Sequence, residues 1–310
     1  MNPLTIGSRT FAWGERTYVM GILNITPDSF SGDGLLLPSP VGAIAPEAER
    51  SGGRVGGEGE RVSEVARRFL AAGADILDVG GESTRPGSQP VSADEELARV
   101  LPVIRSIVAE FPEALVSIDT CKAAVADEAL KAGARIVNDV WGLRADPELG
   151  KVVSSHQCPV ILMHNRSKPA SIEVRERLGG AYLAAEYQDL LEDVKRDLMD
   201  SVAIARRVGI PDGRIILDPG IGFGKTVEQN LELIRRLDEI RLLGFPVLLG
   251  PSRKSFIGYT LDLPPDRRLE GTAAAVAVGI TRGADIVRVH DVEYMARVAK
   301  MTDAIVRRKL

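Results

Sequence analysis

Residues 115–140 read LVSIDTCKAAVADEALKAGARIVNDV, and this stretch has a short β-branched run at each end with a helical stretch between them. The helical stretch ends at Ala132-Gly133, a common stop signal before a following strand. Both runs are largely apolar, as in strands that are covered on both faces. The stretch therefore predicts one parallel strand–helix–strand unit.

The same unit recurs along the chain, and further helical stretches end on Gly73, Gly209 and Gly283. Helices with apolar residues at three- and four-residue spacing are predicted at 60–72, 94–110, 182–208 and 228–243. The apolar runs predict eight parallel strands, at 18–25, 76–81, 115–120, 135–140, 159–164, 214–219, 246–252 and 285–290.

Eight units of this kind predict an α/β fold, a closed (β/α)8 TIM barrel that forms a single domain over residues 1–310. An open doubly wound sheet is the alternative, but no first-strand dinucleotide fingerprint supports it. Residues 1–17 are predicted to form an N-terminal β-hairpin that caps the bottom of the barrel. Residues 35–57, rich in Gly and Pro, are predicted to form a long mobile loop after strand 1, on the active-site face.

Composition and charge exclude several classes of protein. The formal net charge of -4 and a pI near 5.6 argue against a nucleic-acid or anionic-membrane partner. Cys121 and Cys158 have no metal-ligand or disulfide spacing, so both are expected to be buried and reduced. With no secretory leader and no apolar run approaching ~20 residues, a cytoplasmic protein is expected.

Polar side chains stand at the predicted C-terminal end of every strand, where barrels of this kind place their catalytic groups. This pattern predicts one polar ligand that is held from many sides. In chain order the residues are Asn24, then Glu82-Ser83-Thr84-Arg85, Asp119, Asn138-Asp139, His164, Asp218, Ser252-Arg253-Lys254, and Arg288 with His290.

Carboxylate and amide groups at Asp119, Asn138 and Asp218 suit a flat ligand edge that carries several N–H donors. Cationic side chains form a second group, which suits a different part of the ligand. Arg288 and His290 are two residues apart on one strand, so both face the barrel interior, and with Arg85 they could bind an anion such as pyrophosphate.

Asn24 could hold a magnesium-bound oxygen, because Mg²⁺ takes few protein ligands and keeps its waters and phosphates. Simpler structural explanations compete for other polar residues. Asp75, Asp139 and Asp285 could satisfy backbone groups near strand ends, and Thr226 with Glu228 could cap a helix.

Two further histidines and a glycine-rich stretch leave alternatives open. His156 is predicted to be a structural residue in a helix, and His164 is either a core histidine or a ligand. The stretch 218–226 resembles a phosphate-binding loop, but Pro219 occupies a position where that motif requires glycine, so nucleotide hydrolysis is not favoured.

Seven motifs, in order, closely resemble those of the dihydropteroate synthase family. They are MGILNITPDSFS (20–31), DVGGESTRPG (78–87), SIDT (117–120), NDV (138–140), LDPGIGFGK (217–225), GPSRKSF (250–256) and RVHDV (288–292). The resemblance runs from about residue 18 to the C-terminus. It implies a pterin-binding TIM barrel and a transferase of folate biosynthesis, which joins 6-hydroxymethyl-7,8-dihydropterin diphosphate to 4-aminobenzoate and releases pyrophosphate.

The resemblance also implies roles for matching residues, in three groups. Those that would bind the pterin are Asp119, Asn138, Met163, Asp218, Phe223 and Lys254. Those that would bind the diphosphate are Asn24, Arg288 and His290, with Asn24 also serving a magnesium ion. Those that would bind aminobenzoate are Phe30, Thr84, Arg85, Pro86 and Ser252. Met163 could equally be a packing residue.

The implied reaction is substitution at the pterin methylene, with the bond to the diphosphate loosening before the amine attacks. Such a site must stabilise the leaving charge and exclude water, so no strong base or nucleophile is needed. Arg85, Lys254 and Asp218 are the implied catalytic residues. Loops one and two would close over the site, and a homodimer through the last barrel helices is implied.

Two other functions remain as alternatives. A folate-dependent methyltransferase would share the pterin contacts, but it has no use for the cations Arg253, Lys254, Arg288 and His290. A non-catalytic pterin-binding paralogue stays open because the first loop reads Ser31-Gly32-Asp33-Gly34, where the family commonly has Asp directly after that Ser. The 35–57 insertion is also longer than usual for the family.

Overall fold

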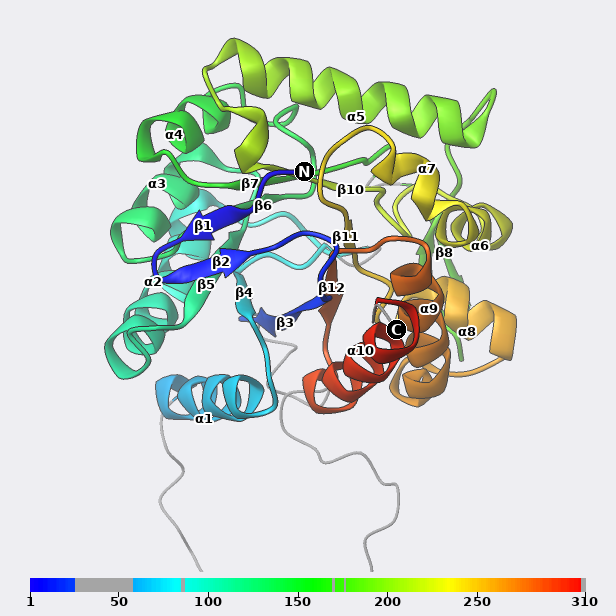
Figure 1. The fold of residues 1–310 in the computed structure, drawn as a ribbon, viewed down its shortest axis with the longest axis horizontal. Coiled ribbons are helices and arrows are strands. Elements are labelled where there is room, and N and C mark those ends of the chain that lie inside the picture. The colour runs from blue at the N-terminus through cyan, green and yellow to red at the C-terminus, as the bar shows by residue number, and fades with distance from the viewer. Residues whose placement is uncertain (26–57, 85–86, 169–170, 176, 308–310) are drawn as a thin grey trace, which may run out of the picture.

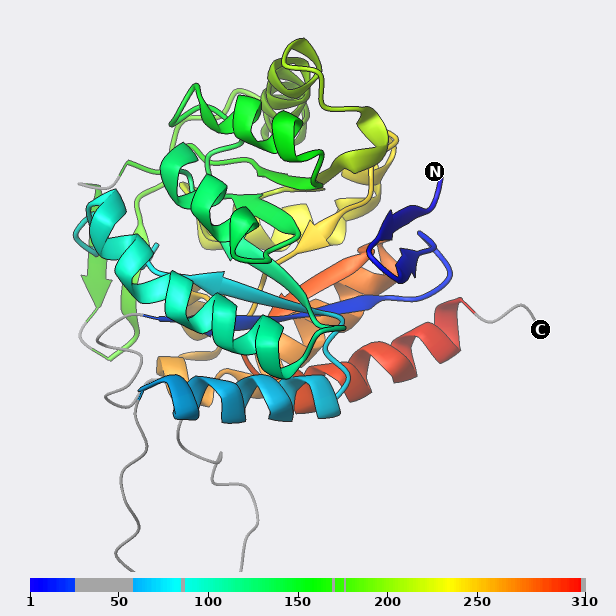
Figure 2. The same ribbon diagram turned by 90° about the vertical axis from the view of Figure 1, so that its left-hand side faces the viewer.

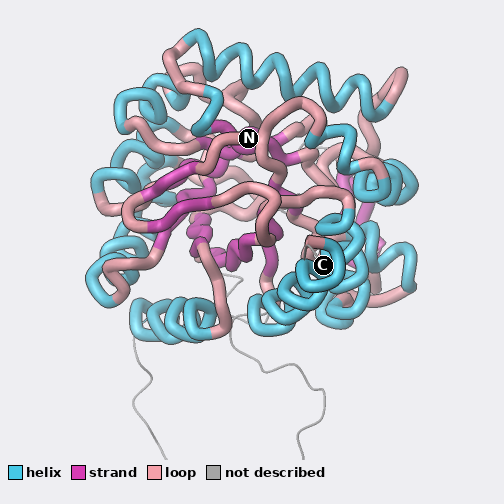
Figure 3. Tube along the Cα trace, viewed as in Figure 1, coloured by secondary structure: helices cyan, strands magenta, loops and turns pink. Residues whose placement is uncertain are grey.

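The computed structural model describes residues 1–25, 58–84, 87–168, 171–175 and 177–307. Its main sheet has eight strands in the order β10-β7-β6-β5-β4-β3-β12-β11. The two ends of this order meet at a parallel bridge between Leu217 and Val247, where Leu217 N donates a 2.9 Å hydrogen bond to Pro246 O. Figure 3 shows the strands inside a ring of helices, and the predicted TIM barrel is confirmed.

Each of the eight predicted strands is present, within a few residues of the predicted bounds. Their bounds are β3 Tyr18–Asn24, β4 Ile76–Gly80, β5 Leu115–Asp119, β6 Ile136–Asp139, β7 Val160–Met163, β10 Ile215–Asp218, β11 Leu248–Leu249 and β12 Ile286–Val289 (Figure 1). All neighbouring pairs in this sheet are parallel. β11 is shorter than the predicted 246–252.

Helices follow the strands around the outside of the barrel. They are α1 Glu58–Ala71, α2 Ala93–Glu110, α3 Ala123–Lys131, α4 Leu149–His156, α5 Leu190–Arg207, α6 Val227–Arg235, α7 Leu237–Arg241, α8 Ser255–Leu261, α9 Leu269–Thr281 and α10 Val292–Val306, with 3-10 turns η2 Asp212–Arg214 and η3 Pro265–Arg267. No helix in these described ranges is long and apolar enough to cross a membrane.

Two helix predictions are wrong at one end or in the middle. The predicted helix 182–208 begins only at Leu190, because Asp189 caps it by accepting a 3.1 Å hydrogen bond from Glu192 N. Its predicted first residue, Tyr182, is instead the last residue of β9 Gly179–Tyr182, which pairs with β8 Ile172–Arg175 in an antiparallel hairpin. The predicted helix 228–243 is divided at Arg236 into α6 and α7.

The predicted N-terminal hairpin is present as β1 Leu4–Ile6 and β2 Arg9–Phe11. It lies at the N-terminal end of the strands, and Figure 2 shows it at the opposite end of the barrel from the β8–β9 hairpin. Its apolar side chains share one buried cluster with one layer of barrel residues. That cluster contains Leu4, Ile6, Phe11, Tyr18, Met20, Ile76, Leu115, Ile136, Ile161, Ile216, Leu248 and Ile286. The barrel interior is therefore filled and closed at this end.

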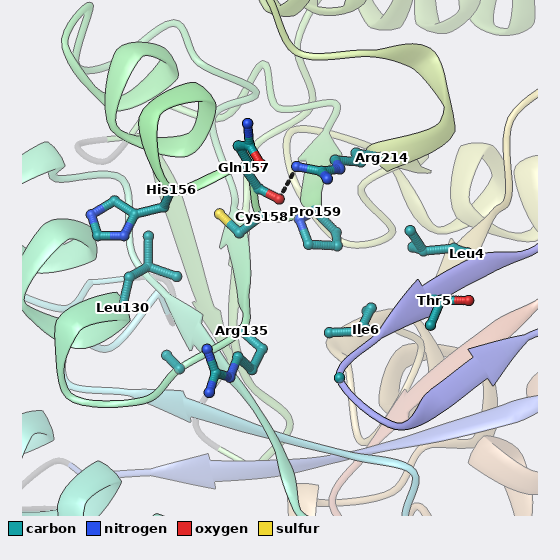
Figure 4. A pocket seen from close by; sticks show the side chains of 12 residues that line it. Leu4, Thr5, Ile6, Leu130, Arg135, His156, Gln157, Cys158, Pro159 and Arg214 are labelled. Carbon is teal, nitrogen blue, oxygen red and sulfur yellow. Dashed lines mark hydrogen bonds between the residues drawn. The ribbon is translucent and has the colours of Figure 1, made fainter.

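A cavity of about 200 Å³ lies between this hairpin and the segments that lead into β6 and β7. Figure 4 shows Arg135 and Pro159, which directly precede these two strands, together with Ile6 of the hairpin. The Arg214 guanidinium donates to the carbonyl oxygen of Gln157 at its edge. Because it lies at the N-terminal strand ends, this cavity is far from the polar C-terminal ends.

Several polar residues have the structural roles that the sequence suggested as alternatives. Asp75 accepts from Val19 N, Asp139 from Trp141 N, and Asp285 from Val247 N, at 2.9, 2.8 and 3.1 Å. His156 lies in α4 and bonds to Asp127 at 2.7 Å. Thr226 forms a capping box at the start of α6. Cys158 is buried as predicted, whereas Cys121 is only partly buried, so that prediction is wrong.

Candidate active site

The site rises directly from the apolar floor of the barrel, because side chains two residues apart in a strand share a face. The floor residues Ile76, Leu115, Ile136, Ile161, Ile216 and Ile286 belong to one buried cluster. Two residues further along each strand, the same inward face carries Asp78, Ser117, Asn138, Met163, Asp218 and Arg288. The sequence therefore places a polar layer above an apolar one, at the C-terminal half of the barrel.

Arg288 is the centre of a buried hydrogen-bond network in this layer. Its Nε donates to Asp78 Oδ2 and its Nη2 to Asp119 Oδ2, both at 2.5 Å. Asn138 Nδ2 donates to the same Asp78 oxygen at 3.0 Å. β12, β4, β5 and β6 thus meet at one cluster of charges, and the side predicted for the anion is joined directly to the side predicted for the flat ligand edge.

Asp78 is a site residue that the sequence analysis missed. It is fully buried, and its Oδ1 has no hydrogen-bond partner within the described part of the protein. An unpaired buried carboxylate oxygen is costly, so a ligand N–H or a water molecule is expected to satisfy it. The sequence does contain a signal for it. Asp78 is a charged residue in an otherwise apolar strand, two residues before the strand end, just as Arg288 lies two residues before His290.

Lys254 and Asp218 belong to the neighbouring part of the site, where each influences the charge of the other. The Lys254 ammonium donates to the carbonyl oxygen of Ile221 and lies 4.6 Å from the ring centroid of Phe223. Burial lowers the pKa of Lys254 to about 8, although the nearby Asp218 carboxylate acts in the opposite direction. Burial raises the pKa of Asp218, and Lys254 opposes this shift in turn.

Asp119 is also strongly influenced by its surroundings. Burial raises the pKa of its carboxyl group, while the Arg288 guanidinium acts to lower it and Asp78 to raise it. Shifted carboxyl and ammonium groups that gather in one place are typical of functional sites. Asp119, Asp218 and Lys254 form such a group at the predicted position.

An apolar wall stands beside these charges. Val140, Met163 and Phe223 form a separate buried cluster, with Trp141 and Tyr182 packed against it. The rings of Tyr182 and Phe223 are stacked, with centroids 5.9 Å apart. A flat aromatic ligand that presents its edge to the carboxylates would lay a face on such a wall. Met163 and Phe223 thus lie in one apolar cluster, and Phe223 is next to the Lys254 ammonium.

The turn between β10 and α6 has a conformation that only glycine allows. Gly220 has a φ of +69°, and a Cβ atom there would lie 1.8 Å from the carbonyl oxygen of His164. Lys225 closes the turn from inside: its ammonium donates to Gly220 O at 2.9 Å and to Phe223 O at 3.0 Å. The turn resembles a phosphate loop in composition only, because Lys225 donates its hydrogen bonds to backbone carbonyls of the turn itself.

His164 lies behind this turn and is buried. Its Nδ1 is 3.0 Å from Lys225 Nζ, and its Nε2 is 3.2 Å from Asp197 Oδ2. Burial, together with the Lys225 charge, lowers the pKa of His164 to about 3. The alternative of a core histidine is therefore favoured over a ligand role.

Ser252 and His290 lie together at the ends of β11 and β12. The Ser252 hydroxyl is 3.0 Å from His290 Nδ1 and accepts from His290 N at 3.2 Å. Arg253 turns away from them, and its Nε donates to Asp291 Oδ2 at 2.9 Å. The sequence suggested that Arg253 is one of the cations available to a bound anion, but in the structure it forms an ion pair with Asp291.

Asn24 stands at the end of β3, beside Gly80 of β4 in the strand register. Its Oδ1 lies 3.8 Å from the place where a Cβ on Gly80 would be, an ordinary van der Waals separation. Within the described residues there is no group of three or more His, Cys, Asp or Glu that could hold a metal ion. A metal here would need ligand oxygens besides Asn24, as Mg²⁺ bound to a diphosphate does.

The second loop is anchored on the side that precedes residues 85–86. Lys122 bonds to Glu82 and, at 2.6 Å, to the buried Glu96 of α2, so Glu82 serves the protein rather than a ligand. The Thr84 carbonyl oxygen accepts a 3.0 Å hydrogen bond from the Tyr182 hydroxyl. Phe30, Arg85 and Pro86, and the departure at Gly32-Asp33 with the 35–57 insertion, lie outside the described residues.

Comparisons with known proteins agree with this geometry. The family model described as "Pterin binding enzyme" matches residues 20–290. The dihydropteroate synthase of Clostridium beijerinckii is 47% identical over 306 residues, which cover 98% of this chain and 100% of that protein.

Two solved structures extend the likeness to three dimensions. Dihydropteroate synthase from Clostridium difficile, in the presence of pteroic acid, is 44% identical with a TM-score of 0.80, over 96% of this chain and 100% of that one. The enzyme from Xanthomonas albilineans with 4-aminobenzoic acid is 35% identical with a TM-score of 0.80, over 98% of this chain and 97% of that one.

The TIM barrel, its polar interior and the matching family model define a pterin binding enzyme. Within this class, the 47% identity over the full length of the Clostridium beijerinckii enzyme indicates one family. The chain belongs to the dihydropteroate synthase family, and it is a transferase of folate biosynthesis. The family and activity expected from the motifs are confirmed.

Proposed function

We propose that the strand-end site joins 6-hydroxymethyl-7,8-dihydropterin diphosphate to 4-aminobenzoate, and that the Asp78–Arg288–Asp119 network is the centre of the site. The single observation that carries this proposal is the contact of Arg288 with both carboxylates at 2.5 Å. Arg288 contacts the carboxylates proposed for the pterin side, and it lies on the strand that is proposed to bind the diphosphate. Its charge can therefore interact with both parts of the substrate.

The pterin edge would be recognised by Asp119, Asn138 and Asp218, whose oxygens accept from ring and exocyclic N–H groups. Lys254 would donate to a pterin acceptor, and the faces of the ring would lie on Met163 and Phe223 of the apolar wall. The charge state of the site supports this arrangement, because two of its carboxyl groups have raised pKa values and its lysine a lowered one.

In the reaction, a bond forms between the aminobenzoate nitrogen and the pterin methylene carbon, and the bond from that carbon to the diphosphate oxygen breaks. The diphosphate leaves with the electron pair, and the nitrogen loses a proton to water. Arg288 and His290 would stabilise the leaving charge, and Lys254 and Asp218 would hold the pterin during the change. Arg85 is proposed as a further catalytic cation, and Phe30, Thr84, Arg85, Pro86 and Ser252 as the aminobenzoate side.

A magnesium ion is proposed as the cofactor, with Asn24 as its protein ligand. Asn24 fits this role because a single amide oxygen at a strand end, next to a diphosphate, leaves room for the waters that Mg²⁺ retains. When bound, the ion would supply charge neutralisation at the diphosphate. The pyrophosphate affinity of the protein would then depend on magnesium, and Asn24→Ala would remove that dependence.

A homodimer through α9 and α10 is proposed as well. These two helices pack on each other and leave apolar side chains exposed, among them Met301 at 63% and Ile305 at 69%. Exposed apolar groups that cluster on neighbouring helices commonly mark an interface. Sedimentation should give a dimer that Ile305→Lys converts to a monomer, and a monomeric wild type would contradict the proposal.

The cytoplasm is proposed as the compartment, because unpaired Cys121 and Cys158 suit a reducing environment.

The proposed reaction is tested by release of pyrophosphate from the two substrates with magnesium, and by detection of 7,8-dihydropteroate. Absence of both products from the folded wild-type protein would overturn it. Pyrophosphate binding separates this reaction from methyl transfer, because a methyltransferase barrel has no diphosphate to hold. A protein that binds pterin but forms no product would be the non-catalytic paralogue.

A further inference from the structure

The β8–β9 hairpin lies in the connection between β7 and α5, and its last residue, Tyr182, is where the sequence predicted a helix to begin. Figure 2 shows this green hairpin at the same end of the barrel as the C-terminal ends of the strands. An ordered hairpin at the mouth of a site must be held by contacts with the segments around it.

The tip of the hairpin is tied to the loops that follow β11 and α8. The buried Arg268 donates through Nη2 to Leu178 O at 2.7 Å and through Nη1 to Arg253 O at 2.8 Å. Gly258 makes room for this side chain, because a Cβ there would lie 2.1 Å from Nη2. The Tyr259 hydroxyl adds a 3.2 Å hydrogen bond to Gly179 O.

The far end of the hairpin carries Tyr182, which contacts both sides of the site. Its hydroxyl donates to Thr84 O at 3.0 Å, and its ring stacks on Phe223 with an interplanar angle of 26°. Thr84 belongs to the loop proposed for aminobenzoate, and Phe223 to the turn proposed for the pterin. Tyr182 therefore connects the loop proposed for aminobenzoate to the turn proposed for the pterin.

We infer that Tyr182 is a positioning residue for the aryl amine, which it serves by fixing the Thr84 loop against Phe223. This inference rests on the proposed function, because it assigns the aminobenzoate side to the Thr84 loop. The hydroxyl sets the distance between the loops, and the ring fills the space behind them. An amine bulkier than 4-aminobenzoate would need the space that the ring fills.

Two substitutions separate these contributions. Tyr182→Phe keeps the ring and removes the hydrogen bond to Thr84, so the KM for 4-aminobenzoate should rise about five- to tenfold while kcat and the KM for pterin diphosphate stay within about twofold. Tyr182→Ala also removes the ring, and it should improve the use of ring-substituted 4-aminobenzoates relative to 4-aminobenzoate itself. Val174→Ala is the matched control, because Val174 lies on the same hairpin and is 66% exposed.

The measurement is steady-state kinetics in both substrates, with thermal unfolding of each variant recorded beside it. An unchanged KM for 4-aminobenzoate in Tyr182→Phe would overturn the inference, and so would a rise confined to the pterin substrate. The same assay on the wild type keeps the proposals apart, because an inactive wild type would overturn the proposed function itself. A control variant with the same selective KM change would assign the effect to the hairpin in general and overturn the role of Tyr182.

Discussion

Arg288 Nη2 donates a 2.5 Å hydrogen bond to Asp119 Oδ2, across 169 residues of sequence. This contact joins β12 to β5 in the barrel interior, and the second contact of Arg288 joins β12 to Asp78 of β4. Arg288, which the sequence assigned to diphosphate binding, and Asp119, which it assigned to pterin binding, therefore belong to one network. Binding of the two parts of the substrate should be coupled through it.

Arg288→Ala should weaken binding of both pterin and pyrophosphate, in contrast to a site with independent halves. The substitution leaves two buried carboxylates without their cation, which typically costs about 3–5 kcal/mol. We expect the Kd for pterin diphosphate to rise at least about a hundredfold, and the Kd for a pterin without diphosphate to rise as well. Titration calorimetry with each ligand measures this. The control is Arg297→Ala, which removes an exposed pair with Glu293 on α10. Pterin affinity that survives Arg288→Ala unchanged would contradict the coupling.

The activity should fall in alkaline solution because Lys254 loses its proton. Burial lowers the pKa of this ammonium to about 8, so the protonated form is lost as the pH rises through 8. If the ammonium holds the pterin, kcat/KM for pterin diphosphate declines about tenfold per pH unit above that value. Lys254→Arg keeps its charge, so its smaller activity should lack this decline, whereas the exposed Lys300→Arg should retain it. A wild-type profile that stays level to pH 9.5 would rule out a protonated Lys254 as the pterin donor.

The fold could be predicted from sequence because the signals that determine it are local. Each strand is indicated by a short apolar run, and several helix ends are indicated by a single glycine. The helix predicted at 182–208 failed because apolar spacing alone cannot show that Tyr182 pairs with Ile172 in a hairpin. Tyr182 also contacts Thr84 and Phe223, which lie far away in the chain.

The candidate site shows the same division. Asp119, Asn138, Asp218 and Arg288 were found because they end apolar strands, where barrels place functional groups. Asp78 is not at the end of its strand but two residues before it, so the search for polar strand ends does not find it. The partners of Arg288 could not be predicted, because they follow from the closure of the barrel and the inward register of strands that are distant in sequence.

Acid should destabilise the protein through His164. The pKa of this buried imidazole is lowered to about 3, against about 6.5 in an unfolded chain. Between these values the unfolded state binds more protons, so stability is complete above pH 6.5 and is lost as the pH falls toward 3, by roughly 4 kcal/mol. The lowered pKa of Asp197 adds to the loss below pH 4. Urea unfolding at pH 7, 5.5 and 4.5 measures the slope. His164→Asn should flatten it between pH 6.5 and 4.5, and the matched control His156→Gln on α4 should not. An equal slope in wild type and His164→Asn would place the titration elsewhere.

Gly220→Ala should disrupt the turn that carries Phe223. The new Cβ would lie 1.8 Å from the carbonyl oxygen of His164, and the φ of +69° adds strain of about 1–2 kcal/mol for any residue with a Cβ. Because a backbone carbonyl cannot move aside cheaply, the variant should lose more than about 3 kcal/mol of stability and bind pterin weakly. Urea unfolding and pterin titration measure the two effects. Gly213→Ala is the matched control, since nothing lies within 4 Å of its added Cβ, and it should change stability by no more than about 0.5 kcal/mol. A Gly220→Ala protein as stable as this control would show that the turn has room that the structure denies it.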